Sequence, residues 1–365
     1  MEQETLDADT LGLLRESLQR YGREKYSFDS RREWLASPEG FRRAAWADYA
    51  NMGWLALPMA AGDGGFGNDA QAIGALMQYV GQSLVLEPLF ASVVLCGGLF
   101  SLAGADTEAR RNLQWLAEGR TIYALAHGED NSDGIGGEVA SQHRDGRLVG
   151  CKTIVLHGDS ADRCIATARD ADGTLGLFLV DMTQPQVNRK CYRLVDGRGA
   201  ATVSFESAEA TRLAAGQDAA SLLAQALDDA RLALCCEILG ASKALNAMTL
   251  AYLKERRQFG RPIGTNQALQ HRMVELYMLE EEGRCVINAA YRAAPGARRA
   301  AVLGAVVQLM TLGRQASHEA VQLHGGIGFT EELAVSHYFR RLMVTNRLLG
   351  DRPAHLEHFA IAAAA

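Results

Sequence analysis

The stretch YLKERRQFGRPIGTNQ, residues 252–267, joins two helical patterns and decides how the chain is interpreted. One helix ends at Arg256 and Arg257, a turn follows with Pro262 and Gly264, and Gln267 opens the next helix. Guanidinium groups beside backbone amides at a helix terminus suit a phosphate or pyrophosphate. A solvated basic helix end is the commoner meaning of two adjacent arginines, so this stretch alone leaves both interpretations open.

A second stretch with the same ambiguity is QLHGGIGF, residues 322–329. Its glycines, Gly325, Gly326 and Gly328, let the backbone come close to a ligand, and Gln322 can both donate and accept hydrogen bonds. The alternative is a glycine-capped helix followed by a turn.

Helical patterns surround these two stretches. Residues 228–260 and 300–324 have apolar positions all round the cylinder, which predicts helices packed on several sides. Near the N-terminus, Asp69 is expected to cap a helix with an apolar face, and another helix is expected from Asp106 to Gly119. The glycine-rich residues 51–68 between the early helices predict an irregular loop.

The middle of the chain has a different pattern. From Thr121 to Phe205 it consists of short apolar runs separated by turns, and the pairs Asp145-Gly146 and Asp172-Gly173 are hairpin signals. We therefore predict an α+β fold that is mainly α. It consists of an N-terminal helical domain (1–119), a middle antiparallel β domain (120–208) and a C-terminal helical bundle (209–365).

Composition removes several classes of protein. The 365 residues are 48% hydrophobic and 22% charged with a net charge of -6, which argues against disorder and against a nucleic-acid-binding protein. No apolar run has membrane-spanning length, and the acidic start MEQETLDADT is unlike a signal peptide. Seven cysteines without a CxxC pair predict reduced thiols, so we expect a cytoplasmic protein without a metal site.

Taken together, the two stretches and their separation resemble the C-terminal signature of the acyl-CoA dehydrogenase family. The segment GWLALPMAAGDGGFG (53–67) resembles the N-terminal glycine loop of that family, GRLVGCK (146–152) its mid-domain strand turn, and GFTEE to HYFRR (328–341) continues the signature. The resemblance implies a C-terminal four-helix bundle, assembly as tetramers, and FAD-dependent α,β-desaturation of an acyl-CoA thioester.

The resemblance also implies which residues bind the cofactor. In this family, segments of one subunit bind the pyrophosphate and adenosine end of the FAD that the neighbouring subunit holds. The corresponding positions here are Arg256, Gln258, Phe259, Gln267, Gln322, Gly325 and Gly326.

The expected catalytic base is missing. The family glutamate falls on Leu349, and the other family position for the base falls on Ala230. Asp351, two residues after the first position, is the candidate for a substitute base, although a solvated carboxylate is the simpler interpretation. Arg231 is either close to the acyl-CoA or ion-paired within the bundle.

The expected flavin-side contacts are also missing. Ile154 and Leu156 replace a tryptophan and a threonine of the family strand, and only Ser132-Asp133 remains of the family flavin loop.

These losses resemble the small, non-catalytic subunits of heteromeric acyl-CoA dehydrogenases, such as pimeloyl-CoA dehydrogenase small subunits or subunits that act on fatty acid or steroid side-chain thioesters. The leading hypothesis is a subunit of an α2β2 heterotetramer that completes the FAD site of a catalytic partner. Two alternatives stay open. One is a self-sufficient homotetramer with a non-standard base, and the other is a non-catalytic pseudoenzyme that serves as an assembly module. The resemblance also implies an electron-transfer flavoprotein as a possible electron acceptor.

Overall fold

The computed structural model describes residues 6–104, 106–129 and 138–364, and the chain forms two compact units. The first unit comprises residues 1–16, 29–73 and 86–230, and the second comprises residues 17–28, 74–85 and 231–365. The boundary therefore falls inside the helices α1 (Ala8–Lys25), α4 (Ala70–Gln82) and α7 (Gly216–Glu255). Within the described residues, no helix combines the length and the apolar run needed to cross a bilayer.

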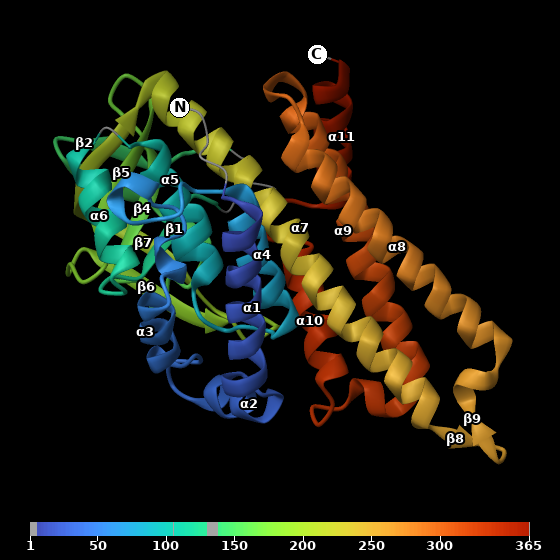
Figure 1. Ribbon diagram of the computed structural model, residues 1–365. Helices are drawn as coiled ribbons and strands as arrows, with labels where there is room; N and C mark the ends of the chain where they lie inside the picture. The colour runs from blue at the N-terminus through green and yellow to red at the C-terminus, as the bar shows by residue number, and fades with distance from the viewer. Residues whose placement is uncertain (1–5, 105, 130–137, 365) are drawn as a thin grey trace. The chain divides into compact units, whose positions relative to one another are not determined.

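The first unit holds a seven-stranded sheet and several short helices (Figure 1). Its helices are α2 (Phe28–Ala36), α3 (Arg43–Asn51), the 3-10 turns Trp54–Ala56 and Ala61–Asp63, a π-helix (Leu89–Gly97), α5 (Gly98–Leu102) and α6 (Thr107–Ala117). Its strands are β1 (Tyr123–Ala126), β2 (Gln142–Arg144), β3 (Arg147–Leu156), β4 (Arg163–Arg169), β5 (Leu175–Asp181), β6 (Val187–Arg193) and β7 (Gly199–Ala215).

The strand pairings form a closed ring of strands. β4 pairs with β5, β5 with β7, β7 with β3, and β2 joins β3 back to β4 through one residue pair, while β6 pairs with β7. The middles of β4 and β5 are buried on both faces, as their continuous apolar runs require.

Most strand pairs are antiparallel, as predicted, but β1 is parallel to β4 over four residue pairs. The chain between them, which includes the β2–β3 hairpin, is long enough for the crossover that a parallel pair needs.

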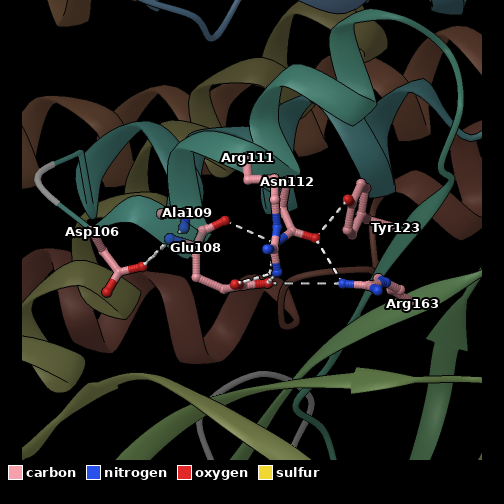
Figure 2. A network of polar contacts seen from close by, with 7 residues as sticks. All are labelled: Asp106, Glu108, Ala109, Arg111, Asn112, Tyr123 and Arg163. Atoms are coloured by element: carbon pink, nitrogen blue, oxygen red, sulfur yellow. Dashed lines mark hydrogen bonds and ion pairs between the residues drawn. The ribbon is translucent and has the colours of Figure 1, made fainter.

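Local signals in the sequence are confirmed in this unit. Asp106 caps α6, because its Oδ1 accepts a hydrogen bond from the backbone N of Glu108 at 2.7 Å. The same helix is fastened to the sheet through Asn112, whose Oδ1 accepts from the Tyr123 hydroxyl of β1 at 2.8 Å and from Arg163 of β4 at 3.2 Å (Figure 2). The Asp145-Gly146 turn links β2 to β3, and both turn residues have positive φ.

The second unit is a helical bundle. It contains α8 (Gln267–Arg292), α9 (Pro295–His324), α10 (Ala334–Thr345), α11 (Arg352–Ala364) and most of α7, with the short strands β8 (Arg257–Gln258) and β9 (Arg261–Pro262). Figure 1 shows α8 and α9 running side by side and β8–β9 at the end of α7.

Glycines allow the helices of this bundle to approach closely. A Cβ built on Gly313 of α9 would lie 3.0 Å from Ile238 of α7 and 3.3 Å from Leu342 of α10. A Cβ on Gly304 would lie 3.3 Å from the Phe359 ring of α11. A side chain at either position would require these neighbours to shift by a few tenths of an ångström.

One buried ion pair fixes the centre of the bundle. Arg341 of α10 and Glu237 of α7 are both inaccessible to solvent, and their side chains are 3.1 Å apart. Arg341 also donates to the backbone oxygen of Val85 at 2.8 Å, and Thr345 donates to the Glu237 carboxylate at 3.2 Å. These bonds partly offset the cost of burying two charges.

Candidate functional site

The arginine-rich stretch forms a tight hairpin at the end of α7. β8 and β9 are antiparallel, with Gln258 opposite Arg261, so the loop has only two residues, Phe259 and Gly260. Their φ angles are 51° and 78°, which is the geometry of a type I′ turn. Glycine adopts this geometry freely, whereas a phenylalanine with positive φ is uncommon.

The side chains of this hairpin project into solvent. Phe259 is fully exposed, and Arg256 is exposed with no side-chain hydrogen bond or ion pair to any described residue. The other two arginines are engaged within the hairpin, because Arg257 reaches the Gly260 oxygen at 3.5 Å and Arg261 donates to Asn266 at 2.9 Å. Arg256 is therefore the guanidinium of this hairpin that is free to bind an anion.

The glycine stretch forms a turn at the end of α9. The helix ends at His324, and Gly325 follows with a φ of 68°. A Cβ built on Gly325 or Gly326 would meet no heavy atom within 4 Å, so both residues face open space. Gln322 is exposed on the last turn of the helix. A phosphate oxygen or another polar ligand can therefore approach this backbone directly.

The bundle brings the two stretches together. The Tyr252 ring, one turn before Arg256, stacks on the His324 ring with centroids 4.3 Å apart, and the Tyr252 hydroxyl donates to the His324 backbone oxygen at 3.3 Å. Gln267 is exposed as the first residue of α8, close in sequence to the hairpin. The sequence did not reveal the Tyr252–His324 contact, because no local pattern signals it.

The positions expected to carry a base have other roles. Leu349 is 5% exposed and Ala230 is fully buried. Asp351 is exposed and precedes α11, where its Oδ1 accepts a hydrogen bond from the backbone N of Ala354 at 3.0 Å. This is the bond of a helix N-cap, which gives Asp351 a structural role.

Arg231 is buried next to a histidine that sequence reasoning missed. His355 of α11 is 3% exposed. Its burial, together with the charges of Arg231 and His358, lowers the pKa of His355 to about 4, and Asp351 and the Gly350 backbone only partly oppose this shift. His355 is thus neutral at pH 7. A short run such as GDRPAHLEH gives no signal for such a neighbour, since Arg231 is distant in sequence.

The β sheet holds a second buried charge. Lys152 of β3 is inaccessible to solvent, and its Nζ donates to Glu129 at 2.6 Å and to Thr167 at 3.1 Å. Burial raises the pKa of Glu129, but hydrogen bonds from Lys152, Ser141 and the Ala140 backbone outweigh it and hold that pKa at about 2. Burial lowers the pKa of Lys152.

The strand expected beside the flavin ring departs from the family pattern. Ile154 is 61% exposed and has a φ of 50°, next to a register shift between Lys152 and Val155, while Leu156 is buried. A β-branched residue with positive φ is strained. Neither side chain offers the ring or hydroxyl that the family strand has, and Ser132-Asp133 lies outside the described residues.

Comparisons with known proteins show similarity to one family of enzymes. The family model described as acyl-CoA dehydrogenase, C-terminal domain, matches residues 220–362. The acyl-CoA dehydrogenase IpdE2 of Mycolicibacterium smegmatis is 30% identical over 327 residues, which cover 86% of this chain and 89% of IpdE2.

Two solved structures have the same fold. A variant of the steroid ACAD Tcur3481-Tcur3483 has a TM-score of 0.88 at 25% identity, and the match covers 98% of each chain. The ChsE4-ChsE5 complex from Mycobacterium tuberculosis has a TM-score of 0.85 at 24% identity, over 100% of this chain and 99% of that one. With the fold, the arginine hairpin and the glycine turn, these matches lead to one conclusion: the chain belongs to the acyl-CoA dehydrogenase family.

Proposed function

We propose that this chain is a subunit of an FAD-dependent acyl-CoA dehydrogenase, and that the end of its bundle completes the FAD site of a catalytic partner subunit in an α2β2 assembly. When bound, FAD would supply the acceptor for the hydride that leaves the β carbon of the acyl-CoA. This chain would bind and orient the FAD, and the partner would supply the base that removes the α proton.

The observation that carries this proposal is the outward-pointing hairpin. Phe259 is fully exposed in a left-handed conformation, which costs about 1–3 kcal/mol, and no burial against the described residues compensates for that cost. The Arg256 side chain, three residues earlier, has no hydrogen bond or ion pair to any described residue. An exposed aromatic ring and a free guanidinium held on a tight turn are suited to contacts with another molecule.

The chemistry of this end of the bundle fits the pyrophosphate and adenosine part of FAD. Arg256 offers a permanent positive charge with a planar array of donors, which matches phosphate oxygens. The open backbone at Gly325 and Gly326 lets phosphate oxygens approach the main chain, and Gln322 adds a side-chain amide. The residues proposed to bind FAD are Arg256, Gln258, Phe259, Gln267, Gln322, Gly325 and Gly326.

The residues at the two family positions for the base support a division of labour between subunits. Leu349 and Ala230 are buried aliphatic residues that cannot take a proton. Asp351 is occupied as the cap of α11. A homotetramer with Asp351 as the base would use a carboxylate that already caps α11 through Oδ1, so the heteromeric arrangement is the better supported one.

An exposed apolar stripe on α8 supports association with another subunit. Val274, Tyr277 and Met278 lie three and four residues apart on one helix face and are 55%, 60% and 55% exposed. Adjacent apolar side chains of this size are typical of protein interfaces. The retained arginine hairpin also argues against a module that binds no cofactor.

The similar structures suggest the substrate class. One is named a steroid ACAD, and two are named for pairs of chains, Tcur3481-Tcur3483 and ChsE4-ChsE5. We therefore propose a CoA thioester of a steroid side chain as the substrate. For the electron acceptor we propose an electron-transfer flavoprotein, which the family resemblance implies.

Co-expression tests this proposal. The chain is purified alone and together with a candidate dehydrogenase subunit that retains the family glutamate, and bound FAD and dye reduction by an acyl-CoA are measured. We expect the chain alone to bind no FAD and to reduce no dye, and we expect the complex to bind FAD and to reduce the dye. Stoichiometric FAD and dehydrogenase activity in the chain alone would contradict the proposal.

A further inference from the structure

A stacked pair of rings connects the arginine hairpin to the glycine turn. Tyr252 lies on the last part of α7, and His324 is the last residue of α9, 72 positions away. Their ring centroids are 4.3 Å apart, and the planes are inclined by 26°. Aromatic pairs in an offset stack of this kind contribute stability beyond their buried area.

The His324 ring is held in one orientation. Its Nδ1 is 2.8 Å from the Ala320 backbone oxygen one turn earlier, and because that oxygen can only accept, Nδ1 carries the proton. The side chain is 5% exposed, so the ring has little freedom to move. A Cβ built on Gly328 would lie 3.1 Å from the His324 Cβ, which indicates that the glycine turn folds back onto this residue.

Backbone hydrogen bonds connect Tyr252 to the arginine hairpin. Its backbone oxygen accepts the hydrogen bond of the Arg256 backbone N at 2.8 Å, and the Arg256 oxygen in turn accepts from Ile263 at 2.8 Å, where the hairpin closes. Its hydroxyl donates to the backbone oxygen of His324 at the end of α9. Each ring therefore lies within one helical turn of a ligand-facing group.

We propose that Tyr252 and His324 are positioning residues that couple the arginine hairpin and the glycine turn, so that both segments are preorganised for a single ligand. This inference rests on the proposed function, in which that ligand is the pyrophosphate and adenosine end of FAD. Preorganisation improves affinity because binding then has fewer degrees of freedom to restrict.

Amide hydrogen exchange on the chain alone tests the coupling without any cofactor. The reporters are Gly325 and Thr330 in the glycine turn and Ile263 in the hairpin, whose backbone N–H groups are hydrogen-bonded. Tyr252→Phe keeps the ring and removes the hydroxyl bond, so exchange at Gly325 and Thr330 should accelerate about 2- to 13-fold, the change that one hydrogen bond provides.

His324→Ala should accelerate exchange at Ile263 by a similar factor, because it removes the stack, and His324→Phe should restore most of the protection. His358→Ala, an exposed histidine of α11, is the matched control and should change neither segment. If each variant affects only its own segment, or if exchange accelerates throughout the bundle, the coupling is refuted.

The FAD affinity of the assembled complex then tests the positioning role. Tyr252→Phe and His324→Ala should each raise the Kd for FAD by about 2- to 13-fold, measured by flavin fluorescence. If Arg256→Ala weakens FAD binding and these two variants do not, the inference fails while the proposed function stands. If none of the three weakens FAD binding, the proposed function fails as well.

Discussion

Replacement of Arg256 by alanine separates cofactor binding from folding. The side chain is exposed and has no partner on any described residue, so its removal should change the free energy of unfolding by less than about 0.5 kcal/mol. A charge-assisted hydrogen bond to a phosphate contributes about 1.5–3 kcal/mol, which corresponds to a roughly 10- to 150-fold increase in the Kd for FAD.

The assay is titration of FAD into the deflavinated complex, followed by flavin fluorescence, with the dehydrogenase rate measured at saturating FAD. We expect weaker binding with little change in the saturated rate, because Arg256 contributes to binding and not to proton or hydride transfer. Arg314→Ala, an exposed arginine of α9 without a side-chain partner on the described residues, should leave the Kd unchanged. An unchanged Kd in the Arg256 variant, or equal effects of both variants, would refute the reasoning.

Three further predictions concern the bundle. Arg341→Met leaves the Glu237 carboxylate buried without its ion pair and should lower the free energy of unfolding by about 3–5 kcal/mol in urea titrations. The control Arg340→Ala removes an exposed ion pair and should lower the free energy of unfolding by less than about 1 kcal/mol. Asp351→Asn keeps a side chain that can cap α11, so the complex should retain its dehydrogenase activity; loss of activity would favour Asp351 as a base. His355 has a pKa of about 4 in the folded chain and about 6.5 in the unfolded chain, so its contribution to the free energy of unfolding is present above pH 6.5 and is lost as the pH falls towards 4. In His355→Gln the free energy of unfolding should therefore fall by up to about 3 kcal/mol less over this pH range. An unchanged pH profile of urea unfolding would contradict this prediction.

Features encoded by neighbouring residues could be predicted from the sequence. The Asp106 cap, the Asp145-Gly146 turn and the start of α8 at Gln267 each depend on a few consecutive residues, and all three lie where expected. The order of helices, β sheet and helical bundle could also be predicted, since helical periodicity gives way to short apolar runs with hairpin signals and then returns.

Features that depend on distant residues could not be predicted in this way. The parallel pairing of β1 with β4 and the stack of Tyr252 on His324 join segments that no local pattern relates. The hairpin at Phe259-Gly260 also lacks the usual Asn-Gly signal, because its turn places a phenylalanine at positive φ.

The residue types of the candidate site are a prediction from the family resemblance, and their geometry comes from the structure. The resemblance to a family identified Arg256 and the glycines, whereas their exposure and the free state of the Arg256 guanidinium came from the structure. The neutral state of His355 beside Arg231 likewise depends on burial, which a sequence does not record.

The most direct test of the central claim is the number of FAD molecules per assembly, measured by native mass spectrometry of the complex with its catalytic partner. If this chain completes the partner's site and holds no flavin of its own, an α2β2 assembly should carry two FAD molecules, and the isolated chain should carry none. Four FAD molecules in that assembly, or one in each isolated chain, would contradict the account.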